Sequence, residues 1–465
     1  MKKINYRLDK TDKTPLYLQL YQQIRLAIHQ QQLHFGDKLP SKRHLSEFLQ
    51  ISQNTVENAY EQLLAEGYIN AKARSGFFVS FQAELDFPCD LPRQKQTAYF
   101  QSRKTYYDLN PNLIDSKNFP IRQWQKAGKQ SLKFWQNEMI ALGDKQGDRN
   151  LRNEIAHYLY ASRGVNCEPE QIVIGTGLEN CVLQLILLFN QISEKPIQYA
   201  MESYGYITIE KMLTAYGKKV LHLPLTTDGQ LDLATLAESQ IDVAYLTPSN
   251  LYPFSQVLSI GQRQQLLEWA NQQPQRYIIE DDYDSEYRYK GKPIPALQSL
   301  DVNEKVIYLG SFSKLLMPSL RVGFMVLPKS LLSLYQEYCG FFNCGVSRFE
   351  QQRLATFIQQ GEFEKHIQRM RKIYRKKMEM LCRLLQSHSD KIRYYGEHSG
   401  AYLLIELLKS PHTSTELVER CLQKNIKIYP LNYPNRQLFS IGFADIDEQE
   451  FNDVFEKLIS ILVLK

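Results

Sequence analysis

The stretch VIYLGSFSKLLMPSLR, residues 306–321, joins a short apolar run to a polar segment with one lysine and one arginine. The run ends at Gly310, Ser311-Phe312-Ser313-Lys314 follows directly, and Arg321 comes seven residues after the lysine. A lysine amine can condense with an aldehyde, and hydroxyl and guanidinium groups bind a phosphate dianion. The stretch therefore predicts a site for a ligand that carries both groups, although Ser-x-x-Lys alone also occurs where the lysine is merely exposed.

A second polar cluster follows another apolar run upstream. Tyr277-Ile278-Ile279 ends in Glu280-Asp281-Asp282-Tyr283, and Asp281 precedes Lys314 by 33 residues. A carboxylate at a strand end can hold a pyridine nitrogen protonated, and a nearby phenol can hydrogen-bond a phenolate oxygen on the same ring. The cluster is typical of a site that binds an aromatic, nitrogen-containing ring.

A glycine turn, Gly175-Thr176-Gly177-Leu178, separates an expected strand at 172–174 from an expected helix that begins at Glu179. Backbone amides at a helix start bind phosphate, and glycines allow the close approach that this needs. Further along, Tyr204 and Tyr206 can stack on an aromatic ring. Each of these groups has an ordinary structural interpretation, as an exposed lysine, a capping aspartate, a turn glycine or core tyrosines, but four of them in this order favour one cofactor site.

With these groups in place, residues 106 to about 460 resemble fold-type I enzymes that depend on pyridoxal 5'-phosphate (PLP), specifically class I aminotransferases. The segments 142–148, 151–159, 163–165 and 171–173 add to the resemblance. It implies that Lys314 is the Schiff-base lysine, Asp281 the partner of the pyridine nitrogen and Tyr283 the partner of the phenolate oxygen. It assigns the phosphate to Ser311, Ser313, Arg321 and the amides of Gly177 and Leu178, and it places Tyr206 at the cofactor and Arg436 at an effector carboxylate.

The chain departs from the family's motifs at several positions. The usual Thr-Pro-Ser-His-Gln-Phe-Pro-x-Gly is replaced by residues 247–255, TPSNLYPFS, so its His, Gln and Gly are all lost. Asn250 can still hydrogen-bond the cofactor's ring oxygen. A known γ-aminobutyrate sensor has an arginine at the position of Thr208 and Pro-Gly-Tyr at the position of residues 204–206. This chain keeps neither feature, which argues against γ-aminobutyrate as its ligand.

The first 80 residues carry most of the net charge of the chain. They hold 11 Lys and Arg against 7 Asp and Glu, a net +4 out of +6 for all 465 residues. Apolar residues recur at helical spacing after Thr14-Pro15, after Pro40-Ser41 and after Ser52, and strand-forming residues flank the turn around Gly76. The pattern predicts a basic helix-turn-helix module with a two-stranded wing.

This segment can contact DNA through three groups of residues. A recognition helix presents its first residues to base edges, which indicates Gln53, Asn54 and Thr55. Phosphate contacts are expected from Ser41, Lys42, Arg43 and Arg74. Capping and basic residues also occur on any small surface domain, but residues 14–80 together resemble the winged helix-turn-helix of GntR-type bacterial repressors, except that Gln53 stands where a basic residue is common.

These segments predict a multidomain chain. We expect an α+β winged helix-turn-helix at 1–81, a linker at 82–105 that contains Pro88 and Pro92, and an aminotransferase-like α/β domain at 106–465. In the last part, helical stretches alternate with β-branched runs, which favours a mostly parallel sheet, and a smaller α+β lobe is expected at about 345–465.

A GntR-like head on an aminotransferase-like body resembles the MocR-type regulators, whose known members include a γ-aminobutyrate sensor and regulators of PLP synthesis.

Composition excludes other classes of protein. Hydrophobic residues make up 43% and charged residues 23%, the longest apolar stretch is far too short to span a bilayer, and the polar N-terminus lacks an apolar signal region. The seven cysteines are scattered without C-x-x-C spacing, and the histidines without metal-ligand spacing, so neither disulfides nor a metal site is expected. A cytoplasmic protein without membrane contact is predicted.

Three functions remain open on the sequence alone. The favoured one is a PLP-dependent transcription regulator that binds operator DNA and senses a small amine, an amino acid or PLP itself. A working aminotransferase with an accessory DNA-binding head is the alternative, and a degenerate scaffold without cofactor is the third. For the regulator we expect at most half-reaction chemistry, and the resemblance implies a domain-swapped, head-to-tail homodimer.

Overall fold

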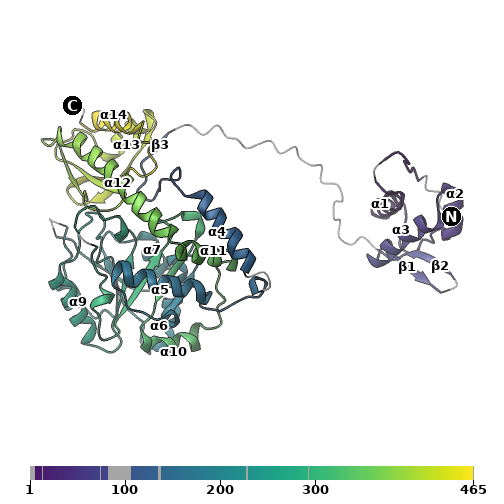
Figure 1. The fold of residues 1–465 in the computed structure, drawn as a ribbon, viewed down its shortest axis with the longest axis horizontal. Helices are drawn as coiled ribbons and strands as arrows, with labels where there is room; N and C mark the ends of the chain where they lie inside the picture. The colour runs from purple at the N-terminus through teal and green to yellow at the C-terminus, as the bar shows by residue number, and fades with distance from the viewer. Residues whose placement is uncertain are drawn as a thin grey trace. The chain divides into compact units, whose positions relative to one another are not determined.

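The computed structural model describes residues 6–12, 14–73, 75–81, 106–134, 138–226, 229–291 and 293–463. They form two compact units, one within residues 1–103 and the other within 104–465 (Figure 1). The linker predicted at 82–105 lies outside the described residues, as does Arg74. Within the described residues, no helix is long and apolar enough to cross a membrane.

The described residues of the N-terminal unit form three helices and a hairpin: α1 (Leu16–His29), α2 (Lys42–Leu49), α3 (Gln53–Ala65), β1 (Ile69–Lys72) and β2 (Gly76–Val79). The two strands pair antiparallel, as a wing requires. Ser41 caps α2 and Ser52 caps α3 through their hydroxyls, which accept from the amides of His44 and Thr55 at 3.2 Å. At the start of α1, Pro15 stands at the N-cap and no side chain caps the helix.

The core of this unit explains the helical spacing seen in the sequence. Leu20 and Ile24 of α1 pack with Val56, Tyr60 and Leu63 of α3, all fully buried. The hydroxyl of Tyr60 donates to the backbone oxygen of Pro40 at 2.9 Å, which ties α3 to the segment that precedes α2. This packing fixes the start of α3 relative to the other helices.

The larger unit contains a seven-stranded sheet in the order β4-β10-β9-β8-β7-β5-β6. The antiparallel strand is β10, which runs against both its neighbours, while the other pairs are parallel. The strands are β4 (Ile172–Gly175), β5 (Tyr199–Glu202), β6 (Val220–Leu223), β7 (Val243–Leu246), β8 (Tyr277–Asp282), β9 (Val306–Ser311) and β10 (Gly323–Val326). Most are apolar along their whole length because helices cover both faces.

Alternate residues of the strands divide between these two faces. Side chains such as Val173, Ile279 and Ile307 pack with α6 (Leu178–Ile192), α7 (Ile207–Ala215) and α10 (Lys329–Cys339). The neighbouring residues pack with α5 (Arg149–Arg163), α8 (Ala234–Ala237) and α9 (Ile260–Asn271). Short 3-10 helices complete the unit at Glu138–Ile140, Pro169–Gln171, Ser285–Tyr287, Gln298–Leu300 and Pro318–Leu320.

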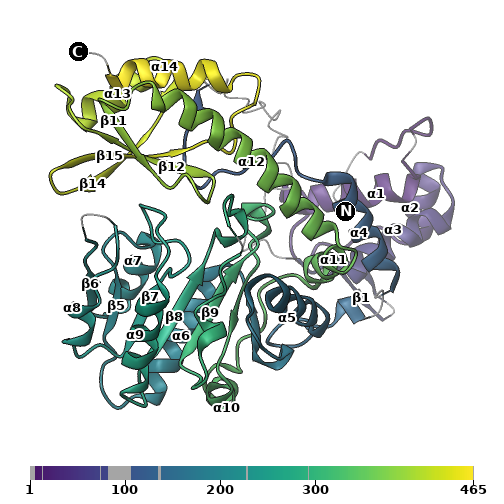
Figure 2. The same cartoon turned by 60° about the vertical axis from the view of Figure 1, so that its left-hand side comes forward.

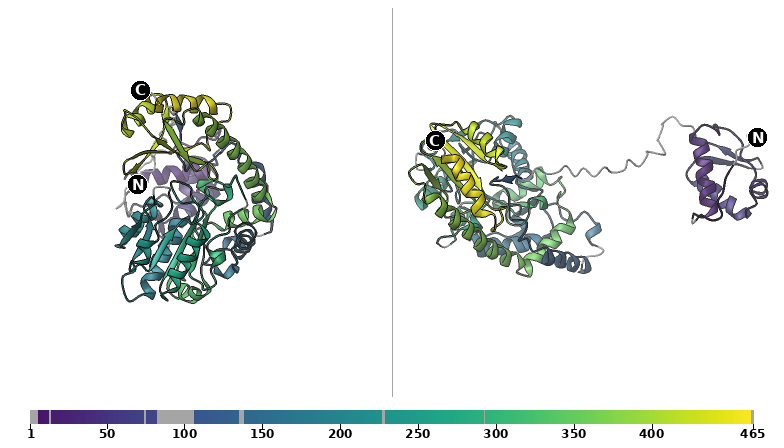
Figure 3. Two further views of the ribbon diagram at one scale, coloured as in Figure 1. Left: turned by 90° about the vertical axis from the view of Figure 1, so that its left-hand side faces the viewer. Right: turned by 90° about the horizontal axis from the view of Figure 1, so that it is seen from above.

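A smaller lobe is built around a four-stranded antiparallel sheet in the order β11-β12-β15-β14. Its elements are α12 (Glu362–Gln386), β11 (Ile392–Tyr395), β12 (Tyr402–Leu407), α13 (Ser414–Gln423), β13 (Ile426–Lys427), β14 (Tyr429–Tyr433), β15 (Arg436–Gly442) and α14 (Phe451–Val463). Figure 2 shows the long α12 leading from α11 (Arg348–Gln359) into the lobe, and Figure 3 shows α14, in yellow, on its outside.

The beginning of the larger unit also belongs to this lobe. The short strand β3 (Tyr107–Asp108) pairs in parallel with β13, and the amide of Gly442 donates to the oxygen of Leu109 at 2.8 Å. The next helix, α4 (Ile121–Phe134), packs against α11. The lobe therefore combines residues from both ends of the unit, whereas the sequence predicts it entirely at about 345–465.

Candidate functional site

The predicted cofactor residues lie at one edge of the large sheet. Asp281 is near the end of β8, Ser311 ends β9, and the glycine turn follows β4. Because β4, β8 and β9 run in the same direction, their carboxyl ends meet at the same edge, where ligands of open α/β sheets bind. Lys314 and Asn250 follow the ends of β9 and β7. The fold thus brings together residues that are far apart in the chain.

Lys314 is flanked by an acid and a phenol. Its Nζ lies 3.4 Å from Oδ2 of Asp284 and 4.7 Å from the centre of the Tyr283 ring. The Asp284 side chain is only 3% exposed, and burial raises its pKa in spite of the opposing charge of Lys314. Among the described residues, Asp284 is the acid that lies nearest to the lysine amine. It was not predicted from the sequence, although it directly follows Tyr283.

Asp281 is fully buried and only partly satisfied. One carboxylate oxygen accepts a hydrogen bond from the Tyr245 hydroxyl at 2.5 Å, while Oδ1 has no hydrogen-bond partner among the described residues. Burial raises the pKa of Asp281 to about 7. A buried carboxylate with an open acceptor fits a protonated pyridine nitrogen, which would supply both the missing donor and a compensating charge.

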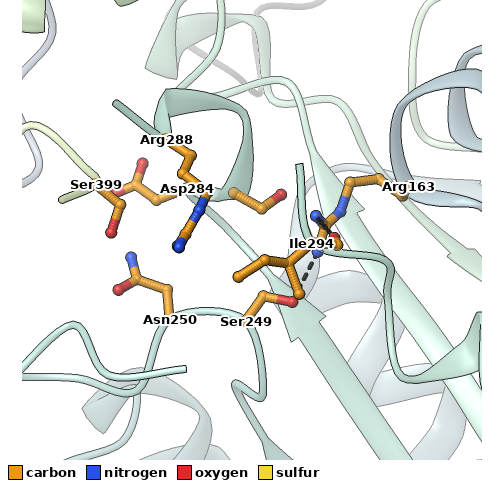
Figure 4. A pocket seen from close by; sticks show the side chains of 8 residues that line it. Arg163, Ser249, Asn250, Asp284, Arg288, Ile294 and Ser399 are labelled. Atoms are coloured by element: carbon orange, nitrogen blue, oxygen red, sulfur yellow. Dashed lines mark hydrogen bonds between the residues drawn. The ribbon is translucent and has the colours of Figure 1, made fainter. Parts of the chain in front are cut away.

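The side chain of Asn250 is buried without a partner. Its Nδ2 and Oδ1 make no hydrogen bond within the described part of the chain, whereas its backbone oxygen accepts from the Tyr283 hydroxyl at 2.8 Å. Figure 4 shows the amide facing Arg288 and Ser399 in a small pocket that Asp284 also lines. An open amide beside Tyr283 fits the role predicted for Asn250 at a ring oxygen of the cofactor.

The glycine turn and Arg321 form a cradle. Gly177, at φ 100°, is the N-cap of α6, and a Cβ there would lie 2.4 Å from Nη2 of Arg321. The positive φ favours glycine at this position, because residues with a side chain rarely adopt it. The Oγ of Ser313 is buried without a partner in the described structure, and that of Ser311 accepts from the Ser313 amide at 3.1 Å. A helix start, hydroxyls and a guanidinium together fit a phosphate group.

A carboxylate already occupies part of this cradle. Oε2 of Glu179 lies 2.7 Å from Nη2 of Arg321, and its Oε1 accepts from the Tyr206 hydroxyl at 3.1 Å. The Tyr206 ring, predicted to contact the cofactor, is 38% exposed and reaches Glu179 through its hydroxyl. The neighbouring Tyr204 stacks on Tyr433, with ring centres 4.8 Å apart. No motif in the sequence indicates that Glu179 contacts Arg321 and Tyr206.

Arg436 has an internal partner. Its Nε and Nη2 donate to the two carboxylate oxygens of Glu406 at 2.7 and 2.8 Å, and Nη2 also reaches the Tyr395 hydroxyl at 2.7 Å. The Arg436 hydrogen bond lowers the pKa of Glu406 more than burial raises it. An effector carboxylate would have to displace Glu406, so the predicted role of Arg436 stays a prediction.

The predicted DNA-reading residues lie at the start of α3. Gln53 and Asn54 are exposed, and Thr55 is half-buried with its Oγ1 2.7 Å from the Oγ of Ser52. On α2, Lys42 forms an ion pair with Glu57, and Nε of Arg43 lies 2.9 Å from Oε1 of Glu47. Ser41 is used as the cap of α2. The described residues include no cluster of His, Cys, Asp or Glu that can hold a metal ion.

Comparisons with known proteins agree with this division of the chain. Residues 16–79 match the model for bacterial regulatory proteins of the gntR family, and residues 106–458 match aminotransferase class I and II. In structure, Pyrococcus horikoshii kynurenine aminotransferase, solved in complex with PMP, is similar at a TM-score of 0.67 and 21% identity, over 78% of this chain and 91% of that one.

Two relatives share the whole arrangement. The HTH-type transcriptional regulator YdeL of Bacillus subtilis (strain 168) is 39% identical over 97% of each chain. The probable rhizopine catabolism regulatory protein MocR of Rhizobium meliloti is 30% identical over 97% of this chain and 95% of its own. With a gntR-family helix-turn-helix domain and an aminotransferase class I and II domain, the chain belongs to the MocR-type transcription regulators.

Proposed function

We propose that this regulator binds PLP at Lys314 and that occupancy of this site controls how its N-terminal unit binds operator DNA. The observation that supports PLP most directly is the buried Oδ1 of Asp281, which has no partner among the described residues and lies at the same sheet edge as Lys314. A buried carboxylate of this kind is costly unless a donor or a cation meets it. The pyridine ring of PLP would do so.

Each residue of the site would have a separate task. Lys314 would attach the cofactor and Asp284, at 3.4 Å from its Nζ, would hold the exchanged proton. Tyr283 and Asn250 would orient the ring, while Ser311, Ser313, Arg321 and the amides of Gly177 and Leu178 would hold the phosphate. When bound, PLP supplies an aldehyde that condenses with amines and a ring that accepts electrons. The sensed ligand would be a small amine, an amino acid or PLP itself.

Net transamination is not part of the proposal. A turning-over enzyme needs a group that binds the carboxylate of successive substrates, and Arg436 is already bonded to both oxygens of Glu406. We expect at most one half-reaction for each bound cofactor. Repeated release of a keto acid with two amino-acid partners, in excess over enzyme, would identify an active aminotransferase instead.

The assembly and location that we propose follow from the resemblance. Shared fold-type I sites imply a head-to-tail homodimer, and operator binding implies that the protein is cytoplasmic. Light scattering on the full chain would test the dimer, with a monomeric mass at micromolar concentration as the contradicting result.

The experiment combines cofactor absorption with operator binding by the full-length protein. Wild type should develop a visible absorption band with PLP and retard DNA from the region upstream of its own or a neighbouring gene at physiological salt, where non-specific binding is weak. Lys314→Ala should lose the band and should lose the effect of PLP or amines on retardation. Lys329→Ala, which removes an exposed lysine paired with Glu168, is the matched control.

Two results would overturn the proposal. One is operator binding whose response to PLP and amines is the same in Lys314→Ala as in wild type. The other is a wild-type protein that fails to develop the band, or fails to retard the DNA fragment, while its melting temperature shows that it is folded.

A further inference from the structure

Glu179 places a negative charge where a ligand phosphate is expected. It is the second residue of α6, directly after the Gly177 and Leu178 amides, and its Oε2 is 2.7 Å from Nη2 of Arg321. The same Nη2 also donates to the Thr176 oxygen at 3.3 Å. Glu179 also lies at the same sheet edge as Asp281 and Lys314, because α6 begins just after the carboxyl end of β4.

The carboxylate and a phosphate would compete for the same donors. Arg321 is the guanidinium at the Gly177 turn, and a phosphate dianion that reaches it and the helix start would meet the carboxylate of Glu179 at close range. Like charges at such distances repel, and the guanidinium gains little from pairing with both. A bound phosphate therefore disfavours the contact between the Glu179 carboxylate and Arg321.

The partial exposure of the pair allows this exchange. The side chain of Arg321 is 51% exposed and that of Glu179 is 29% exposed, so both groups can recover hydration when they separate. Exposed pairs of this kind contribute little stability, in contrast to buried ones. Glu179 would weaken phosphate binding without preventing it.

We propose that Glu179 is an internal competitor for the phosphate of the ligand, so that a phosphorylated aldehyde occupies the site in proportion to its concentration instead of remaining bound at all times. The inference rests on the proposed function and extends it, because a weakened phosphate site makes the phosphorylated aldehyde itself a ligand that the protein can sense. Displacement of Glu179 also breaks its hydrogen bond with Tyr206 at the start of α7. The exchange would thus alter contacts between α6, α7 and Arg321.

The test replaces the charge and retains the shape. Glu179→Gln keeps an oxygen that accepts from Tyr206 but removes the negative charge. We expect PLP, titrated by its absorption band, to bind at least tenfold more tightly to this variant than to wild type, which corresponds to about 1.4 kcal/mol. Pyridoxal, which has the aldehyde but lacks the phosphate, should bind both proteins within about threefold of each other.

A matched control removes a similar pair elsewhere. Glu170→Gln breaks the ion pair with Arg149, whose atoms are also 2.7 Å apart, outside the cradle, and should leave PLP and pyridoxal affinities unchanged. Inorganic phosphate provides a readout that does not depend on Lys314. It should raise the melting temperature of Glu179→Gln more than that of wild type or of Glu170→Gln.

The outcomes separate this inference from the proposed function. Equal or weaker PLP binding by Glu179→Gln, or an equal gain for pyridoxal, would show that the carboxylate does not compete with phosphate. If neither protein forms the absorption band, the proposed function fails, and the melting temperatures in phosphate still decide whether Glu179 competes. An equal phosphate shift in all three proteins would overturn the inference.

Discussion

Two arginine–carboxylate pairs in the aminotransferase-like unit have nearly the same length and very different surroundings. Nε of Arg163 lies 2.6 Å from Oδ2 of Asp282, and both side chains are 2% exposed. Nη2 of Arg321 lies 2.7 Å from Oε2 of Glu179, with the side chains 51% and 29% exposed. Distance therefore does not distinguish a pair that supports the structure from one that can exchange its partner, whereas access to water does.

The buried pair is part of a network at the end of β8. The Tyr308 hydroxyl also donates to Oδ2 of Asp282 at 2.7 Å, and Nη2 of Arg163 donates to the Ser249 hydroxyl at 2.7 Å. Arg163 thus connects α5 with β8 and with the segment that carries Asn250. Figure 4 shows the bond between Arg163 and Ser249 beside the pocket. The network holds the ends of two strands in the geometry that the site requires.

The largest effect should come from the buried pair. Asp282→Asn would leave the guanidinium of Arg163 buried without its counter-charge, and the unfolding free energy should fall by about 3–5 kcal/mol. Urea unfolding of the full chain, followed by circular dichroism, would measure the change in the aminotransferase-like unit. A loss below about 1 kcal/mol would mean that water reaches Arg163 and would remove the contrast between the two pairs.

A smaller effect, visible as pH dependence, should come from Asp281. Its pKa is raised to about 7, so the folded protein binds a proton more readily than the unfolded chain, and stability falls as the pH rises from about 4 to about 7. Without PLP, the unfolding free energy should fall between about pH 5 and pH 8 by about 3 kcal/mol less in Asp281→Asn than in wild type, since one pKa unit corresponds to about 1.4 kcal/mol.

Other acids limit how much one substitution can change. Burial also raises the pKa of Glu202 and Glu280 to about 7, so part of the pH dependence should persist in Asp281→Asn. Saturating PLP should raise stability at about pH 8 more in wild type than in Asp281→Asn, because only the carboxylate can pair with a protonated ring. Unfolding curves at about pH 5 and pH 8, with and without PLP, measure the pH dependence and the effect of PLP. If the unfolding free energy of Asp281→Asn fell as much between these pH values as that of wild type, the raised pKa would not belong to Asp281.

The exposed pair should contribute least to the stability of this unit. Glu179→Gln should change the unfolding free energy by less than about 1 kcal/mol, because Arg321 and the introduced amide would both remain hydrated. The same urea experiment applies, with Asp282→Asn as the contrasting variant. A loss similar to that of Asp282→Asn would show that Glu179 is needed to build the cradle, and the tighter PLP binding expected for the variant would then have no basis.

The parts of the site that the sequence predicts are local in character. The motifs GTGL, YIIEDDY and SFSK each place a polar residue directly after an apolar run, and the carboxyl ends of the parallel strands bring Gly177, Asp281 and Lys314 to one edge. The fold class follows from the same alternation of strands and helices. Strand ends and helix starts are encoded by neighbouring residues, so short-range patterns are sufficient for them.

Partners that come from distant strands could not be predicted in this way. Glu406 reaches Arg436 because β12 and β15 pair in the register that sets Glu406 opposite Leu438, and nothing near Arg436 in the sequence indicates that register. The pairing of β3 with β13 joins residues that are more than 300 positions apart for the same reason. Glu179 precedes Arg321 by 142 positions, so their contact also depends on the assembled sheet.

The smallest effect should come from a third pair, on the DNA-binding unit. Arg43 and Glu47 lie one turn apart on α2, with Nε and Oε1 at 2.9 Å, and their side chains are 83% and 62% exposed. Glu47→Gln should leave the melting temperature unchanged, because water replaces the lost partner of Arg43. Operator affinity should rise by at most about threefold, since the substitution removes a negative charge near an arginine expected to contact phosphate.

A salt series of retardation experiments would test this pair. The gain in operator affinity from Glu47→Gln should shrink as salt rises, because ions screen exposed charges. Glu61 is an exposed acid in α3, away from the residues at the start of that helix that are expected to contact DNA, so Glu61→Gln should give a smaller gain. A loss of affinity would mean that Glu47 holds Arg43 in the orientation used for binding. The exposed pair would then act as a positioning contact, and exposure alone would no longer separate exchangeable pairs from those that the structure requires.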